Sequence, residues 1–181
     1  MLLVVAATER ELAFVESAET LCCGVGPVES ALQTARALAV RRPDAVLHVG
    51  IAGARGLEPP ALVLGSESVY CDVIDPMVGL TRVERAFPDA GLLAAARAAL
   101  PQAHVLPIAT SGRVGGGDGC CDVEAMEGFG VLRAAELAEI PALELRAVSN
   151  APGEQDRDLW RIDDALTALA AAVERLVPVL G

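Results

Sequence analysis

Short apolar runs alternate with longer amphipathic segments along almost the whole chain. Continuous β-rich runs are typical of buried strands, and apolar residues spaced three or four apart predict helices. We expect strands at 2–6, within 19–23, and at 45–49, 61–73, 103–108 and 142–148, and helices at 27–41, 89–100, 123–139 and 158–177. This repeated order predicts one α/β domain over residues 1–181, with a largely parallel sheet covered on both faces.

The composition excludes disorder and gives no sign of a membrane segment. Hydrophobic residues make up 53% of the 181 and charged residues 22%, which is typical of a chain with a sizeable buried core. Every apolar run of near-transmembrane length is broken by a charge, a glycine or a proline. The apolar run near the N-terminus lacks a basic region before it. We therefore interpret it as a first buried strand, not a signal peptide, and expect a cytoplasmic protein.

The charge balance disfavours polyanionic partners. The chain has 14 basic and 25 acidic residues, for a net charge of −11, and its largest basic cluster is the pair Arg41 and Arg42. Because binding to phosphate backbones and anionic lipid depends on clustered Lys and Arg, we expect neither nucleic acid nor a membrane surface as a partner. A small molecule is the expected ligand.

The cysteines and histidines predict no metal site. The five cysteines form the pairs 22–23 and 120–121 plus Cys71, which matches neither a CxxC motif nor the framework of a small secreted domain. We expect all five to be reduced, mostly buried thiols. A metal site or triad built on histidine would need His48 and His104 in one place, so we expect neither a metal nor another cofactor.

Polar residues gather where the predicted strands end. In a parallel sheet the ligand binds beyond the carboxyl ends of the strands. Four such segments are AATERE, GIAGARG, ATSGRVGGGDG and SNAPGEQDRDLW, and a fifth candidate is Met126-Glu127 near the start of a predicted helix. Glu11 follows a helix start at Thr8 and could deprotonate a water at this edge. From the residues alone a helix-start acid is the better interpretation, and Glu9 fits it equally well.

Five segments carry a resemblance to a known family. AATERE, CGVGPVESAL, DAVLHVGIAGA, VEAMEG and PALELRAVSNAPGEQDRDLW, in this order and spacing, resemble the nucleoside phosphorylase and nucleosidase superfamily. They are most similar to the futalosine hydrolases, the nucleosidases of the futalosine route to menaquinone. The resemblance spans nearly the whole chain. It implies a three-layer α/β/α phosphorylase-like fold with a central, mostly parallel but mixed sheet, no cofactor, and a homo-oligomer, either a dimer or larger.

The resemblance also implies roles for individual residues. Glu11 would activate the water, Glu127 would accept hydrogen bonds from two vicinal ribose hydroxyls, and Met126 would pack against the sugar. Ile51 and Ser149 would be further substrate contacts. We expect Glu124, three residues before Glu127, to be a capping or solvated acid.

Asn150 indicates which base would leave. Adenine-directed nucleosidases have Ser-Asp where this chain has Ser149-Asn150, and an ionised aspartate would repel the carbonyl oxygen of a 6-oxopurine. An asparagine can donate to O6 and accept from a protonated N7, so Asn150 favours hypoxanthine. The alternative is an asparagine that only shapes a turn. The implied reaction is hydrolysis of futalosine to hypoxanthine and dehypoxanthine futalosine.

Other functions stay open at this point. One is a nucleosidase acting on methylthioadenosine, S-adenosylhomocysteine or aminodeoxyfutalosine. Others are a purine nucleoside phosphorylase, for which Glu11 leaves an unfavourable charge near a phosphate, and a non-catalytic nucleoside-binding module.

The chain departs from the family pattern in two places. Residues 17–24 leave little room for a strand hairpin, and the Gly-rich segment 109–122 is shorter than the base-covering loop of relatives, so it is either a lid or a plain linker. We expect Arg55 to be a solvent-exposed loop cation, although it could instead contact a phosphate. We expect Trp160 to be a core aromatic, although it could instead cover the base or reach the carboxylate-bearing end of the substrate. Arg157 and Arg161 flank Trp160 and are candidates for an anionic end of the substrate.

Overall fold

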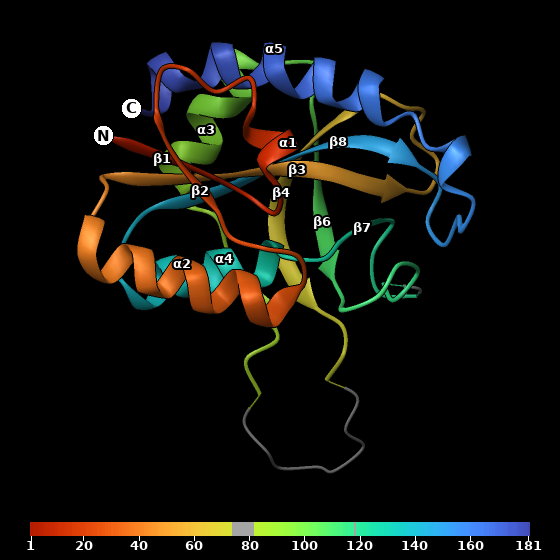
Figure 1. The fold of residues 1–181 in the computed structure, drawn as a ribbon, viewed down its shortest axis with the longest axis horizontal. Helices are drawn as coiled ribbons and strands as arrows, with labels where there is room; N and C mark the ends of the chain where they lie inside the picture. The colour runs from red at the N-terminus through yellow and green to blue at the C-terminus, as the bar shows by residue number, and fades with distance from the viewer. Residues whose placement is uncertain (74–81, 118) are drawn as a thin grey trace.

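The computed structural model describes residues 1–73, 82–117 and 119–181. These residues form an eight-stranded mixed sheet between helices (Figure 1). The strands are β1 (Leu2–Ala6), β2 (Glu19–Cys22), β3 (Ala45–Ala54), β4 (Leu62–Tyr70), β5 (Arg85–Ala86), β6 (His104–Thr110), β7 (Val123–Ala125) and β8 (Ala142–Asn150). The helices are α1 (Glu9–Leu12), α2 (Pro27–Arg41), α3 (Ala90–Ala99), α4 (Gly128–Leu137), the 3-10 turn η1 (Arg157–Leu159) and α5 (Ile162–Leu180).

The sheet is mostly parallel, with antiparallel pairs in one part. β1 pairs in parallel with β2 and β3, β3 with β8, and β6 with both β4 and β7. β3 with β7, β4 with β5 and β4 with β8 are antiparallel. Pairing therefore runs from β3 through β8, β4, β6 and β7 back to β3. This closed circuit brings the ends of β3, β7 and β8 together.

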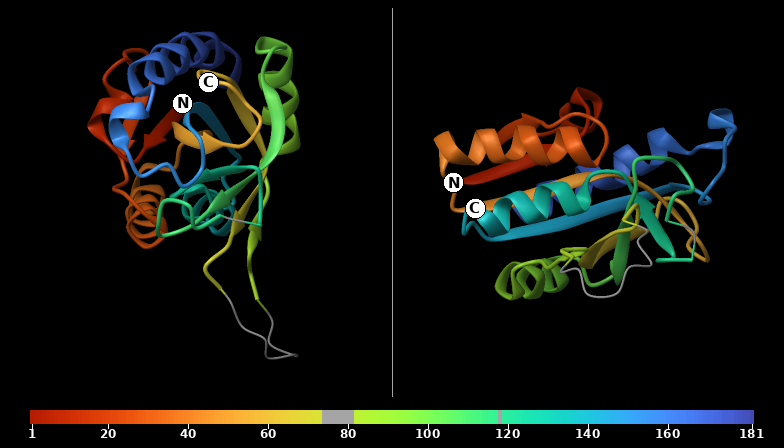
Figure 2. Two further views of the ribbon diagram at one scale, coloured as in Figure 1. Left: turned by 90° about the vertical axis from the view of Figure 1, so that its right-hand side faces the viewer. Right: turned by 90° about the horizontal axis from the view of Figure 1, so that it is seen from below.

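Helices cover both faces of the open part of the sheet. α1, α3 and α5 lie on one side and α2 and α4 on the other, as Figures 1 and 2 show. Alternate residues of β1 enter different cores: Val4 packs with the α5 residue Leu169, whereas Val5 packs with the α4 residue Val131. A third cluster fills the closed circuit, and it consists of Ala52, Ala54, Val63, Ile108, Val123, Ala125 and Val148. The expected three-layer arrangement with a mixed central sheet is confirmed.

Most predicted elements are present, but β5 was not predicted and several boundaries were wrong. The strand expected at 61–73 spans Leu62–Tyr70, and the helix expected at 158–177 spans Ile162–Leu180. Two boundaries were wrong by more. Residues 123–125 were expected in a helix, yet they form β7, because β3 and β6 both offer free backbone edges there and pair with it. β3 was expected to end at Val49 but continues to Ala54, so GIAGARG begins inside a strand. The reason is that β8 pairs with β3 along its whole length, including its glycines. Among the described residues, no helix combines the length and apolarity needed to cross a membrane.

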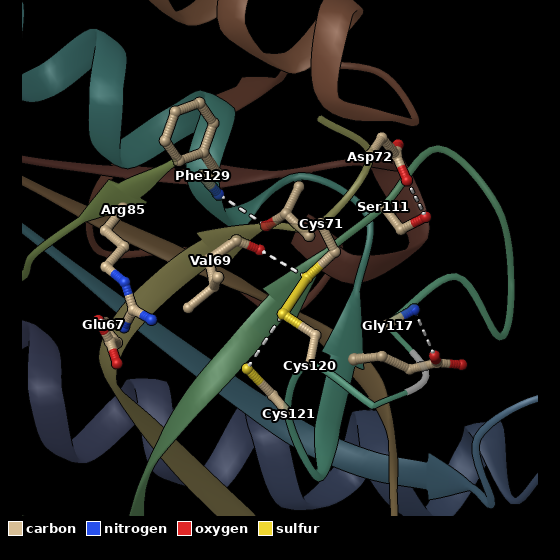
Figure 3. The surroundings of a disulfide bond; sticks show 12 residues. Glu67, Val69, Cys71, Asp72, Arg85, Ser111, Gly117, Cys120, Cys121 and Phe129 are labelled. Carbon is tan, nitrogen blue, oxygen red and sulfur yellow. Dashed lines mark hydrogen bonds and ion pairs between the residues drawn. A yellow bond between two sulfur atoms is a disulfide. The ribbon is translucent and has the colours of Figure 1, made fainter. Parts of the chain in front are cut away.

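The expectation of five reduced cysteines was also wrong. Cys71 and Cys120 form a disulfide (Figure 3). The two cysteines lie 49 residues apart in the sequence, but Cys71 follows β4 and Cys120 lies in the loop after β6, and these two strands pair up to Tyr70 and Thr110. Cys22, Cys23 and Cys121 are free thiols. Spacing alone could not predict a bridge that the strand pairing creates.

Candidate active site

The expected site residues converge on a cavity of about 220 Å³ beside the carboxyl ends of β3 and β8. The sequence-predicted residues that line it are Glu11, Ile51, Met126, Glu127 and Asn150. A larger cavity, of about 630 Å³, is lined by Arg55 and adjoins the first through the shared residue Glu124. The smaller cavity is the candidate active site, because Glu11, Glu124 and Glu127 all line it.

Glu11 is held rigidly at the cavity wall. It is the third residue of the one-turn helix α1, whose N-cap is Thr8. One carboxylate oxygen, Oε2, accepts from the Thr8 backbone N–H at 3.1 Å and from its hydroxyl at 2.7 Å, and the other, Oε1, accepts from the Ile51 N–H at 3.1 Å. Glu11 is only 7% exposed. It is therefore both a capping acid and a cavity carboxylate, and the two interpretations do not compete. Glu9 is exposed.

Glu127 is buried at the start of α4. Its Oε1 accepts from the Gly26 N–H at 3.1 Å, and its Oε2 lies 3.4 Å from Nη2 of Arg146. Burial raises the pKa of the Glu127 carboxyl above its ordinary value, although the Arg146 charge and the Gly26 N–H act in the opposite direction. Two oxygens held in this way can still accept from hydroxyl groups in the cavity.

Arg146 is the main site residue that sequence reasoning missed. It lies on β8, is 1% exposed, and donates from Nε to Glu144 at 2.8 Å and from Nη2 to Nε2 of His48 at 2.6 Å. Nδ1 of His48 lies 3.0 Å from the Val5 carbonyl oxygen, so a neutral ring with its proton on Nδ1 satisfies both contacts. Burial, reinforced by the Arg146 charge, lowers the pKa of His48 well below its usual value. His48 is thus an acceptor for Arg146.

Two glycines in the family-like segments make room for this cluster. A side chain on Gly50 would collide with the Arg146 guanidinium, and one on Gly128 would collide with the Glu144 carboxylate. These glycines were the one sequence signal that could have revealed a bulky buried pair beneath the site. Burial by itself would lower the pKa of Arg146, but Glu144 and Glu127 together raise it above its ordinary value.

Asn150 ends β8 and is 6% exposed. Its Oδ1 accepts from the Ser149 hydroxyl at 2.7 Å, and its Nδ2 donates to the Ala151 carbonyl at 2.8 Å. Ser149 is fully buried, and its hydroxyl also lies 3.3 Å from the Ala52 carbonyl oxygen. Ser149 therefore contacts Asn150 and not the cavity, whereas Ile51 and Met126 are half-buried at its wall.

Three expectations about neighbouring residues were wrong. Trp160, expected in the core, is half-buried and lines the cavity. Two contacts hold it there: its indole N–H donates to the Glu154 carbonyl at 3.1 Å, and the Arg157 guanidinium lies 5.5 Å from its ring centroid. Arg55, expected in an exposed loop, is half-buried, because β3 extends to the residue before it. Glu124, expected to be a capping or solvated acid, is 8% exposed on β7. Arg161 is exposed and donates to the Asp164 carboxylate at 2.7 Å.

Within the described ranges, no three His, Cys, Asp or Glu side chains come together in a way that could hold a metal ion.

Known proteins resemble this chain in sequence and in fold. A family model described as the phosphorylase superfamily matches residues 20–122. A futalosine hydrolase of Streptomyces coelicolor is 38% identical over 190 residues, covering 90% of this chain and 79% of the relative. A native structure of futalosine hydrolase from Helicobacter pylori strain 26695 superposes with a TM-score of 0.87 at 16% identity, over 99% of this chain and 97% of that one. A methylthioadenosine/S-adenosylhomocysteine nucleosidase of Streptococcus pneumoniae, in complex with 8-aminoadenine, gives a TM-score of 0.86 at 22% identity, over 99% of both chains.

The structural likenesses show the fold, and the family match shows that the chain is a member of the phosphorylase superfamily. A second relative, a futalosine hydrolase of Acidothermus cellulolyticus, is 32% identical over 88% of this chain and 75% of that relative. Together with the Streptomyces coelicolor relative, it narrows the family within this superfamily. The chain belongs to the futalosine hydrolase family.

Proposed function

We propose that this chain hydrolyses the N-glycosidic bond of futalosine and releases hypoxanthine and dehypoxanthine futalosine. The observation that carries the proposal is the meeting of Glu11, Glu127 and Asn150 around one cavity in a chain of the futalosine hydrolase family. Each of these side chains comes from a different element and supplies a different chemistry. A fold alone would not support an activity, because one fold hosts many functions.

In the proposed mechanism the protein supplies a base, a sugar clamp and a leaving-group contact. Glu11 accepts a proton from a water that attacks the anomeric carbon. The bond from this carbon to the purine breaks, and the electron pair leaves with the base. Glu127 accepts from the ribose hydroxyls and stabilises the positive charge that develops on the sugar. N7 of the departing base takes up a proton from solvent, and Asn150 then donates to O6 and accepts from the N7–H group.

Hydrolysis fits the charges of the cavity better than phosphorolysis. Glu11 places negative charge where a phosphate would attack, and the Arg146 guanidinium is already bonded to Glu144 and lies beside Glu127. Arg55 lines the neighbouring cavity, and Arg113 and Arg157 lie in the cavity wall at exposed positions. Their cations can instead meet the carboxylate-bearing end of futalosine.

We also propose a cytoplasmic homo-oligomer with one domain per chain. α2 displays large apolar side chains to solvent, with Val28 67% and Leu32 63% exposed. Val25, which is 57% exposed, lines the cavity just before this helix. An apolar helix face next to a cavity is the kind of surface that a second copy of the chain can cover.

The proposed reaction is tested by chromatography of the released base. The protein is incubated with futalosine, aminodeoxyfutalosine, methylthioadenosine or inosine, each with and without phosphate. We expect release of hypoxanthine from futalosine that does not depend on phosphate. Preferential release of adenine from aminodeoxyfutalosine or methylthioadenosine, or of hypoxanthine from inosine, would overturn futalosine as the substrate. Release that depends on phosphate would indicate a phosphorylase. Nucleoside binding in calorimetry without release of base would indicate a non-catalytic module.

Asn150→Asp should move the base preference from 6-oxopurines toward 6-aminopurines. The aspartate loses the donor to the Ala151 carbonyl and would repel O6, while it can accept from a 6-amino group. We expect the ratio of kcat/KM for futalosine to that for aminodeoxyfutalosine to fall by at least about tenfold. Asn150→Ala is the control, because it should lower both values without favouring the amine. An unchanged ratio in Asn150→Asp would exclude Asn150 as the base contact.

A further inference from the structure

Glu124 lies in the cavity wall beside Asn150 with no role in the mechanism above. We propose that Glu124 is a second specificity-determining residue, which accepts a hydrogen bond from the N1–H group of a 6-oxopurine. This inference rests on the proposed function and deepens it, because it extends recognition of the base from Asn150 to the next edge of the ring.

Gly53 places the two side chains on either side of one open space. In the sheet, Gly53 on β3 is the register partner of Glu124 on β7 and of Asn150 on β8. A Cβ atom at Gly53 would lie 3.1 Å from Nδ2 of Asn150 and 3.4 Å from Cγ of Glu124. Because Gly53 has no side chain, it leaves open the space between the Asn150 amide and the Glu124 carboxylate. All three residues line the cavity.

The Glu124 carboxylate is oriented by backbone groups and keeps acceptor capacity. Its Oε1 accepts from the Gly115 N–H at 2.8 Å and from the Gly153 N–H at 3.2 Å. Its Oε2 accepts at 3.3 Å from the Gly117 N–H, a bond that Figure 3 draws beside the disulfide. An ionised carboxylate has about four acceptor sites, so three backbone donors leave one for a ligand.

The two purine classes present opposite patterns to this pair. A 6-oxopurine offers the O6 acceptor next to the N1–H donor, which complements the Asn150 amide and the Glu124 carboxylate. A 6-aminopurine carries a lone pair on N1, which a carboxylate oxygen repels. The wrong ligand leaves a buried polar group of the site without a hydrogen-bond partner. Such a site discriminates strongly between the two purine classes, because the desolvated group finds no substitute for water.

A purely structural role for Glu124 makes a different prediction, and Asp72 provides the matched control. Glu124 ties the Gly-rich segment to the turn at Gly153, so its loss could simply loosen the cavity. Asp72 holds the same segment from the other side. It accepts from the Ser111 hydroxyl at 2.7 Å (Figure 3) and from the Gly112 N–H, also at 2.7 Å. It does not line the cavity. Asp72→Asn therefore loosens the segment without changing a base contact.

The test measures inhibition of futalosine hydrolysis by free hypoxanthine and by adenine. In Glu124→Gln the amide can turn an N–H toward N1, so we expect the preference for hypoxanthine over adenine to fall by about 10- to 100-fold relative to the unchanged protein. Asp72→Asn should weaken both inhibitors alike and keep the ratio. Equal weakening of both in Glu124→Gln would overturn the inference and leave Glu124 as a loop anchor.

Two further results keep the test decisive. If circular dichroism shows that Glu124→Gln does not fold, Glu124→Asp takes its place, because the shorter side chain keeps the charge but moves the oxygens away from the base. Glu124→Asp should also lower the preference for hypoxanthine over adenine. An unchanged preference in this variant would overturn the inference. Failure of the proposed function has a separate signature, since the unchanged protein would then release no hypoxanthine from futalosine. A protein that releases hypoxanthine, yet keeps its base preference in the Glu124 variants, would reject only this inference.

Discussion

Glu11→Gln should reduce kcat for futalosine hydrolysis by roughly two to four orders of magnitude, the range that a positioned general base contributes. An amide cannot accept the proton of the attacking water. It also cannot satisfy its surroundings, because the backbone N–H groups of Thr8 and Ile51 face different oxygens of the carboxylate. Whichever way the amide turns, its NH2 group faces one of these donors, so we expect a smaller loss of stability as well.

Single-turnover kinetics with futalosine, together with urea unfolding, separate the two effects. Glu9→Gln is the matched control, because it removes the same charge from the same helix at an exposed position, and its turnover should stay near that of the unchanged protein. If Glu11→Gln stays within about threefold of the unchanged protein, Glu11 takes no part in proton transfer. If its kcat falls only to the extent that the protein unfolds, its role is that of a helix cap.

Local sequence patterns predicted the elements better than their connections. The helix 27–41 was predicted to the residue, because Pro27 suits a first helical turn and the apolar spacing continues to Arg41. Residues 123–125 were misassigned, since a three-residue strand pairs with distant partners and has no local signal. The Cys71–Cys120 disulfide was missed for the same reason, because only the pairing of β4 with β6 brings these two cysteines together.

The candidate site was predictable where a residue acts at the cavity surface. Glu11, Glu127 and Asn150 stand in segments that resemble the family, and all three line the cavity. The layer beneath them was not predictable, because His48 and Arg146 look like isolated polar residues within apolar strands. Their meaning depends on the pairing of β3 with β8, in which His48 is opposite Glu144 and Gly50 is opposite Arg146.

Arg146→Met should destabilise the fold by about 3–5 kcal/mol, the usual result of removing one partner of a buried ion pair. Methionine fills much of the volume, but it leaves Glu144 and Glu127 without their cation and His48 without its donor. The free energy of unfolding in urea measures this loss. Arg133→Met is the control, since Arg133 pairs with Glu136 at 2.7 Å on the surface of α4 and such pairs contribute about 0–1 kcal/mol.

The pH dependence distinguishes lost charge pairing from lost packing. Burial already raises the pKa of Glu127 in the folded protein, and losing the Arg146 charge, which opposes that rise, should raise the pKa of Glu127 further above its value in the unfolded chain. The folded state then gains stability as the pH falls from neutral toward the raised pKa of Glu127, so the stability deficit of Arg146→Met should shrink as the pH falls. The double variant Arg146→Met/Glu127→Gln lacks the titrating carboxylate, so its deficit should start smaller and change less with pH. If the loss of unfolding free energy is the same at every pH, Arg146 stabilises the fold by filling space. The Glu127 carboxylate then does not depend on the charge of Arg146.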